Sequence, residues 1–289
     1  MSARNDIDAS IGQSPVGVIA GAGSLPFAVA DSILRRGVKP VIFAIRGFCD
    51  SQRLQPYAHH WIALGQVGRL TRLLRAERCG EVVFIGALVR PALSEIRLDW
   101  GTLRVIPKIA ASLRGGDNHL LSGVGQIFEQ HGFRLVGVQD VAPDLLMPEG
   151  NLARAAPDAD ALRDIERGFA ALHAMSPFDI GQALVIINGH VVAVEDIEGT
   201  DGLLERVARL RTQGRIRAKP GIGMLVKGPK STQDLRLDLP TIGPKTIEGA
   251  VAAGLRGVAI MAGQAIVAEP QTMIEIADKA GIFVTGIRR

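Results

Sequence analysis

The residue types best suited to chemistry lie in a loop of the second half of the chain. Between residues 227 and 240 the sequence carries both charge signs, namely Lys227, Lys230, Asp234, Arg236 and Asp238. Leucines alternate with charges from 235 to 239, so an extended chain would place the aspartates on one face. Carboxylates suit Mg²⁺ or Mn²⁺, and neighbouring lysines suit a phosphate on the same ion. The loop predicts phosphoryl chemistry; the alternative is a solvated strand face on which the arginine pairs with the aspartates.

A second acidic stretch, residues 195–201, leaves a predicted hairpin and enters a predicted helix over 200–212. Thr200 and Asp201 suit the cap and first turn of that helix. The functional alternative is that Glu198, Thr200 and Asp201 reach the same pocket as the loop. Lys219, just before Pro220, is a further candidate phosphate contact.

A glycine-rich turn in the first half is the third candidate. It consists of Gly21, Ala22, Gly23, Ser24 and Leu25. It stands between a predicted strand and a predicted helix, where dinucleotide-binding folds offer backbone N–H groups to phosphate. Pro26 replaces the third glycine of the dinucleotide fingerprint and no acidic residue follows the next apolar run, which disfavours NAD. Arg46 keeps an NADP-dependent oxidoreductase open, and a tight turn without ligand is the other reading.

These candidates require a scaffold, and the pattern predicts an α/β protein of two domains. Short apolar runs alternate with helical spacing, which is typical of a Rossmann-like parallel sheet in the N-terminal half. Asn188-Gly189 between two apolar runs predicts a hairpin inside a C-terminal α/β domain. The proline-rich segment 142–158 separates the halves. We therefore expect a flexible arm over 1–15, an N-terminal domain over 16–148 and a C-terminal catalytic domain over 149–289.

Composition excludes several classes of protein. Aromatic residues make up only 4% of the 289 residues, and no dense Lys/Arg block accompanies the net charge of +4, so no nucleic-acid partner is expected. No apolar run reaches the roughly 18 residues of a spanning helix, and the N-terminus lacks a secretory pattern, which predicts a cytoplasmic protein. Neither the cysteines nor the histidines show zinc spacing.

Four stretches together resemble the LpxI-type UDP-2,3-diacylglucosamine diphosphatases, in the same order from about residue 16 to 286. They are residues 21–26, Gly181-Gln182 with the following hairpin, residues 193–201 and residues 227–240. The resemblance implies a two-domain cytoplasmic hydrolase of lipid A biosynthesis in a Gram-negative bacterium. Such enzymes cleave the diphosphate of UDP-2,3-diacylglucosamine to UMP and 2,3-diacylglucosamine 1-phosphate (lipid X). The resemblance also implies a divalent cation, usually Mg²⁺, and an active site in the interdomain cleft.

The resemblance also implies roles for particular residues. Asp234 matches the acidic position associated with catalysis and Asp238 a nearby carboxylate, so both are expected to act in catalysis and to hold the metal. The family shows an acidic residue where this chain has Asn118, so Asp117 stays only a candidate contact. The expected substrate-binding residues are Gly21, Ala22, Gly23, Ser24, Leu25, Asp117, Glu198, Thr200, Asp201, Lys219, Lys227, Lys230, Thr232 and Gln233.

The expected partner is the lipid-linked UDP-sugar substrate. The mildly basic balance is compatible with peripheral contact at the inner membrane surface, and a homodimer is the expected assembly. Two other functions stay open at this point. One is an NADP- or nucleotide-sugar-dependent oxidoreductase, and the other is a non-catalytic nucleotide- or lipid-binding protein.

Overall fold

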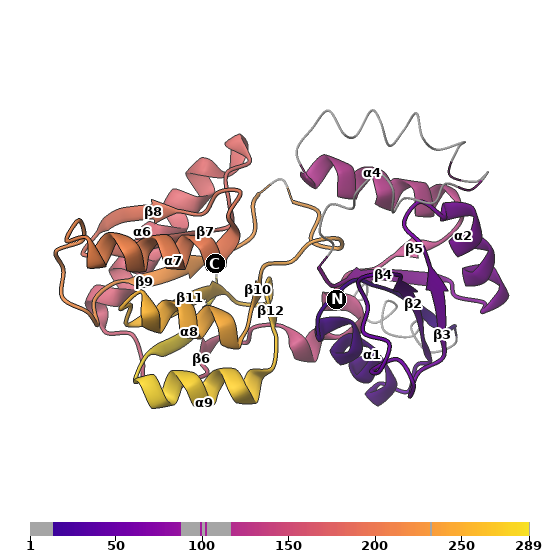
Figure 1. Cartoon of the computed structure of the whole chain (residues 1–289), viewed down its shortest axis with the longest axis horizontal. Helices are drawn as coiled ribbons and strands as arrows, with labels where there is room; N and C mark the ends of the chain where they lie inside the picture. The colour runs from indigo at the N-terminus through magenta and orange to yellow at the C-terminus, as the bar shows by residue number, and fades with distance from the viewer. Residues whose placement is uncertain (1–13, 88–98, 100–101, 103–116, 232, 289) are drawn as a thin grey trace, which may run out of the picture. The chain divides into compact units, whose positions relative to one another are not determined.

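The computed structural model describes residues 14–87, 99, 102, 117–231 and 233–288, with the backbone alone for 117–122 (Figure 1). The chain divides into two compact units. The first comprises residues 1–145 together with 234–238, and the second comprises 146–233 together with 239–289. The sequence-based boundary lay at 148/149, and it kept 234–238 in the C-terminal half. Most of the predicted arm and Thr232 lie outside the described residues.

The first unit is built on a five-stranded sheet in the order β3-β2-β1-β4-β5. Its strands are β1 (Val16–Ala20), β2 (Pro40–Ile45), β3 (His59–Ile62), β4 (Glu81–Ile85) and β5 (Arg134–Leu135). All neighbouring pairs are parallel, so the predicted Rossmann-like parallel sheet is confirmed. The strand order reverses at β1, where doubly wound folds bind ligands beyond the carboxyl ends of the strands.

Helices cover this sheet. They are α1 (Leu25–Arg35), α2 (Val67–Ala76), α4 (Asp117–Gln130), the short α5 (Val138–Val141) and the 3₁₀ turn η2 (Pro143–Leu145). Val41 and Phe43 of β2 share a core with Leu74 of α2 and Phe128 of α4. Strand β5 ends at Leu135, and α5 begins at Val138.

The second unit contains a six-stranded mixed sheet in the order β6-β13-β11-β9-β7-β8. Its strands are β6 (Gly150–Asn151), β7 (Ala183–Ile187), β8 (His190–Val194), β9 (Met224–Lys227), β11 (Gly257–Met261) and β13 (Phe283–Ile287). The central strands β9, β11 and β13 are parallel, and the strands flanking them are antiparallel. A parallel pair, β10 (Thr241–Ile242) and β12 (Ile266–Val267), lies apart from this sheet.

Alternation along the strands places a helical layer on each face of this sheet. The helices are α6 (Ala159–Met175), α7 (Gly199–Thr212), α8 (Pro244–Ala252) and α9 (Pro270–Ala280). Leu184 of β7 belongs to the core of α6, whereas Val185 belongs to the core of α7, α8 and α9. Figure 1 shows these three helices side by side on one face of the sheet and α6 on the other.

The predicted hairpin joins β7 and β8. Asn188 and Gly189 both have positive φ, 49° and 75°, as a type I′ turn requires. In the part of the chain that the structure describes, no helix is both long and apolar enough to cross a membrane.

Candidate functional site

The glycine turn after β1 is bound to the turn after β4. The Gly21 N–H donates to Ile85 O at 2.9 Å and the Ala22 N–H to Ala87 O at 2.8 Å, and Ala87 N–H returns a bond to Ala22 O. A Cβ on Gly21 would lie 2.7 Å from Ala87 O, so glycine is needed for this approach of two backbones. The backbone N–H groups of Gly21 and Ala22 are therefore engaged within the fold, and a substrate contact at these two residues stays a prediction.

The rest of this turn leads into α1. Gly23 is exposed with φ at 98°, and a Cβ there would meet nothing within 4 Å. Ser24 and Leu25 begin the helix, whose first turn contains no acidic residue. A helix N-terminus carries partial positive charge. Gly23, Ser24 and Leu25 are thus the part of the predicted turn that remains suited to an anion.

The segment carrying the predicted catalytic aspartates is a turn, not an extended strand. The N–H groups of Leu237 and Asp238 both donate to Asp234 O, at 3.0 and 3.2 Å. The expectation that Asp234, Arg236 and Asp238 share one face of an extended chain is therefore wrong. The Asp234 side chain also accepts a hydrogen bond from the Arg236 backbone N–H at 3.0 Å, and this local bond favours the turn.

Asp234 is held by Arg236. The guanidinium Nε donates to Oδ1 at 3.0 Å and Nη2 donates to Oδ2 at 2.8 Å, so both carboxylate oxygens are engaged. Hydrogen bonds from Arg236 lower the pKa of Asp234 below its ordinary value, against an opposing effect of partial burial. Asp234 is accordingly an oriented, ionised carboxylate.

Helix α4 seats this turn within the first unit. Arg236 Nη1 lies 2.8 Å from Glu129 Oε1, and Leu237 packs over Gly125. A Cβ on Gly125 would lie 3.2 Å from Leu237 Cδ1 and 2.9 Å from Leu135 Cδ2. One ion pair and one close apolar contact therefore fix the turn that carries Asp234.

The predicted metal ligands do not form a closed cage. Among the described residues, no three His, Cys, Asp or Glu side chains are grouped so as to hold a metal ion. Magnesium in phosphate chemistry is commonly held by one or two carboxylates plus phosphate oxygens and water. Asp234 and Asp238, both partly buried, fit that open kind of site, in which the substrate supplies the remaining oxygens.

In the second unit, hydrogen bonds join the side chains of Lys227, Thr200 and Glu195; the first two were predicted site residues. Lys227 Nζ donates to Thr200 Oγ1 at 2.8 Å, and Thr200 Oγ1 donates to Glu195 Oε1 at 2.8 Å. Glu195 Oε2 accepts the backbone N–H of Gln182, also at 2.8 Å. Glu195 is 8% exposed and Lys227 7% exposed. The structure thus brings Lys227 and Thr200 into contact, and the Thr200 hydroxyl links the ammonium to the Glu195 carboxylate.

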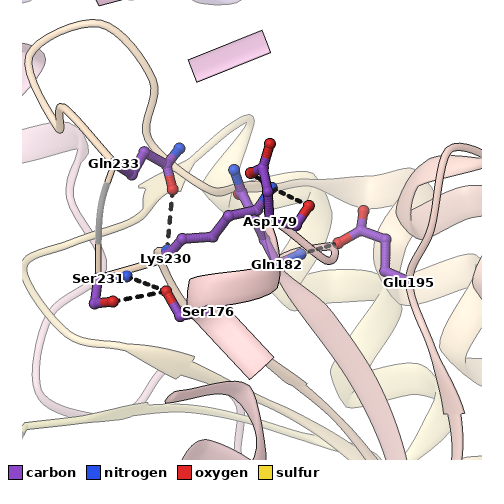
Figure 2. A network of polar contacts seen from close by, with 7 residues as sticks. All are labelled: Ser176, Asp179, Gln182, Glu195, Lys230, Ser231 and Gln233. Carbon is purple, nitrogen blue, oxygen red and sulfur yellow. Dashed lines mark hydrogen bonds and ion pairs between the residues drawn. The ribbon is translucent and has the colours of Figure 1, made fainter. Parts of the chain in front are cut away.

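Lys230 and its neighbours are anchored by the 3₁₀ turn η3 (Ser176–Phe178) that follows α6, and by Asp179 directly after it (Figure 2). Lys230 Nζ lies 2.7 Å from Asp179 Oδ1 and 3.1 Å from the Asp179 carbonyl. Ser231 donates its N–H to the hydroxyl of buried Ser176 at 2.6 Å. Gln233 closes the turn by accepting the Lys230 N–H through its side chain, at 3.1 Å. Lys230, Ser231 and Gln233 are therefore each held by a side-chain hydrogen bond.

Other predicted residues lie outside this cluster. Glu198 pairs with Arg206 at 2.7 Å, and Asp201 is exposed in the first turn of α7. Lys219 is exposed in the loop that enters β9, at the end of the strand opposite Lys227. Asp117 is the first residue of α4, but its side chain, like all of Thr232, lies outside the described residues.

A hollow of about 990 Å³ lies against α6 and the hairpin turn. Gly223 and Arg256, which precede β9 and β11, line it. The hollow is therefore at the amino ends of these parallel strands and contains none of the predicted site residues. Lys227 stands at the carboxyl end of β9, where open α/β sheets bind their ligands.

Comparison with known families decides the assignment. The family models described as the LpxI N-terminal domain and the LpxI C-terminal domain match residues 15–145 and 148–285. The chain belongs to the LpxI family. A curated LpxI relative from Caulobacter vibrioides (strain ATCC 19089 / CIP 103742 / CB 15) is named UDP-2,3-diacylglucosamine pyrophosphatase LpxI. The two chains are 37% identical over 272 residues, covering 94% of this chain and 97% of the relative.

The LpxI assignment confirms the resemblance carried by the four stretches. The gap between the two LpxI domain matches also falls where the chain divides, at 145/146. Residues 234–238 are the exception, since they match the LpxI C-terminal domain in sequence and pack with the first unit in space.

Sequence reasoning missed several residues of these LpxI clusters. Glu195 belonged to a recognised acidic stretch, but nothing in its spacing singled it out from its neighbours. Ser176 and Asp179 stand 55 and 51 residues from their partners, Ser231 and Lys230. Glu129 stands 107 residues from Arg236. No local pattern encodes such pairs, whereas the Asp234–Arg236 pairing was the stated alternative to a metal-binding face.

Proposed function

We propose that this LpxI-family chain hydrolyses the diphosphate of UDP-2,3-diacylglucosamine in lipid A biosynthesis. The products are UMP and 2,3-diacylglucosamine 1-phosphate. The observation that carries the proposal is the match, over 94% of this chain, to the relative named for that pyrophosphatase activity. The charged groups of the 227–238 loop support it, because a diphosphate needs cations around it and a carboxylate near the attacking water.

The chain's own groups account for the steps of a hydrolysis. Asp234, held ionised by Arg236, accepts a hydrogen bond from water and orients it toward one phosphorus. Asp238 assists from the same turn. The water oxygen forms a new bond to phosphorus and gives up a proton, which passes through Asp234 to solvent. The bridging P–O bond breaks, and the electron pair of that bond leaves with the other phosphate. Lys230 and Lys227 supply positive charge for the phosphates.

We also propose that turnover depends on a divalent cation, Mg²⁺ or Mn²⁺. Asp234, Asp238 and the diphosphate oxygens are the donors that would hold it. When bound, such an ion supplies neutralisation of the phosphate charge. The first test is UMP release from UDP-2,3-diacylglucosamine by the full-length protein, with Mg²⁺ and again after EDTA. Absence of release with Mg²⁺ rejects the hydrolase, and undiminished release in EDTA rejects metal dependence.

Isotope labelling of the products identifies which phosphorus the water attacks. We propose attack at the phosphorus on the sugar side, with UMP as the leaving group. Hydrolysis in ¹⁸O-labelled water then places the label in the 1-phosphate of the lipid product. Label in UMP would assign the attack to the other phosphorus and reverse the leaving group. Mass spectrometry of both products distinguishes the two outcomes.

The two acyl chains of this substrate require an apolar contact. Phe178 and Ile197 are 75% and 98% exposed, unusually so for large apolar side chains. Their segments lie side by side, because the Gly181 N–H donates to Glu195 O at 3.2 Å. We propose that Phe178 and Ile197 touch the lipid phase from which the substrate is taken.

A further inference from the structure

Glu195 and Lys227 are two buried groups of opposite charge that share one hydroxyl. Thr200 Oγ1 accepts from Lys227 Nζ and donates to Glu195 Oε1, both at 2.8 Å. A threonine hydroxyl has a single proton to donate. Because that proton goes to Glu195, the hydroxyl presents a lone pair to Lys227. The Glu195 carboxylate therefore orients the hydroxyl so that it accepts a hydrogen bond from the ammonium.

The same carboxylate is tied to the start of the functional loop. Gln182 donates its backbone N–H to Glu195 Oε2 at 2.8 Å (Figure 2), and its carbonyl accepts the N–H of Gly228 at 3.0 Å. Gly228 directly follows Lys227 at the end of β9. Gln182 thus holds the backbone next to Lys227, and Glu195 is linked to its ammonium through Thr200.

Stability alone does not explain a lysine here. Charges that are buried must be paired, and apolar residues of similar volume are often as stable or more stable at such positions. Lys227 is 7% exposed at the carboxyl end of a central strand whose other residues, Met224, Leu225 and Val226, are apolar and buried. The ammonium at this place, with a carboxylate and a hydroxyl dedicated to it, points to a functional use of its charge.

We propose that Glu195, acting through Thr200, is a positioning residue that holds the Lys227 ammonium for the diphosphate. This inference rests on the proposed hydrolase function. Neither Glu195 nor Thr200 needs to touch the reacting atoms. Their contribution is to keep a cation in the orientation that the leaving phosphate requires, where small displacements are costly to rate.

The test uses the full-length protein with Mg²⁺ and UDP-2,3-diacylglucosamine. Glu195→Gln removes the negative charge and keeps one carbonyl oxygen. Its NH₂ group either faces the Gln182 N–H, which breaks that hydrogen bond, or donates to the Thr200 hydroxyl, which reverses the direction of that one. Thr200→Val removes the shared hydroxyl and keeps the shape. We expect each to lower kcat about a hundredfold with KM changed less than threefold. Thr200→Ser should restore most of kcat, since it restores the hydroxyl.

Two comparisons separate positioning from a merely structural role. Glu195→Gln combined with Thr200→Val should be no slower than either alone, because both break one chain of contacts. The matched control is Asp160→Asn, which removes a carboxylate from an exposed ion pair on α6 of the same unit and should keep wild-type kcat. Wild-type kcat in Glu195→Gln or Thr200→Val, or multiplying losses in the double variant, overturns the proposal, whatever the melting temperatures show.

A measurement that does not depend on activity tests directly whether Thr200 holds the Lys227 ammonium. In ¹⁵N-lysine-labelled protein, the buried, hydrogen-bonded Lys227 ammonium should give a signal, assigned by its loss in Lys227→Met. The signal should shift or vanish in folded Thr200→Val and persist in Thr200→Ser. An unchanged signal in Thr200→Val overturns the positioning role even if activity falls. Wild-type protein that releases no UMP overturns the proposed function itself.

Discussion

Arg236 grips both oxygens of Asp234, with Nε 3.0 Å from Oδ1 and Nη2 2.8 Å from Oδ2. The third guanidinium nitrogen, Nη1, reaches Glu129 on α4 at 2.8 Å. A single arginine therefore orients the proposed catalytic carboxylate and binds it to a helix of the first unit. This arrangement makes the geometry of Asp234 depend on residues that are more than a hundred positions away in the chain.

Arg236→Lys should lower kcat strongly although it keeps the charge. A lysine ammonium cannot reproduce a planar fork that engages two oxygens and a third partner at once. We expect a loss of about 10²-fold in kcat, measured as UMP release at saturating substrate. Glu129→Gln, which weakens only the outer contact, should lose less. Equal activity of Arg236→Lys and the wild type would contradict the orienting role.

Gly125→Ala should separate stability from activity. Alanine is favoured over glycine inside a helix by about 1 kcal/mol, yet its Cβ would come within 3.2 Å of Leu237 Cδ1 and 2.9 Å of Leu135 Cδ2. Leu237 must shift, and the Asp234 turn shifts with it. We expect a kcat loss of about tenfold with little change in melting temperature. Adding Leu237→Ala to this variant should recover part of the loss; a further loss would contradict the steric explanation.

Lys230 and Lys219 should behave differently, although the sequence suggested both as phosphate contacts. Lys230 is held by Asp179 beside the functional loop, whereas Lys219 lies at the opposite end of β9. Lys230→Met should lower kcat/KM about tenfold or more, because a positive group near the phosphates is lost. Lys219→Met should stay within twofold of the wild type. A reversed order would move the site to the other edge of the sheet.

Asp144 should contribute stability that disappears in acid. Partial burial alone raises the pKa of Asp144, but hydrogen bonds from the Ser32 hydroxyl and from Arg35 outweigh it and leave the pKa below its ordinary value. The contribution is therefore complete above the unfolded-state pKa of about 3.9 and is lost as pH falls through the lower folded value.

Asp144→Asn should accordingly be less stable than the wild type at pH 6 and close to it at pH 2. The pair is about half exposed, so screening by solvent limits the difference at pH 6 to about 1 kcal/mol. Urea unfolding at the two pH values measures it. A difference that stays constant between them would assign the effect to packing rather than charge.

Phe178→Asp and Ile197→Asp should slow turnover only when the substrate sits in a lipid phase. Burying one such side chain in an apolar phase contributes about 1.5–3 kcal/mol, and a carboxylate removes that gain. We expect an increase in apparent KM of about tenfold with substrate in phosphatidylcholine vesicles. A water-soluble short-chain analogue is the control and should be cleaved at the wild-type rate. Equal losses on both substrates would place these residues in the site rather than at the lipid surface.

Local patterns predicted most of the scaffold, because strands and helices here follow hydrophobic periodicity. The hairpin at Asn188-Gly189 and the helix predicted over 200–212 lie where the sequence pattern places them. The two-residue strands β6, β10 and β12 are too short to carry a period. Gly21 was interpreted as room for a ligand, but Ala87 O occupies that room. A sequence indicates that a glycine is needed and does not indicate which group fills the space.

The contacts of residues 234–238 also limit how this family can be recombined. A chimera of two relatives joined near residue 145 would combine the α4 of one parent with the aspartate turn of the other. The two residues of each contacting pair would then come from different parents, in Gly125–Leu237 as in Glu129–Arg236. Such hybrids should fold in both halves but have low activity. Activity should return when residues 234–238 come from the same parent as α4. The boundary that preserves activity therefore differs from the domain boundary in the sequence.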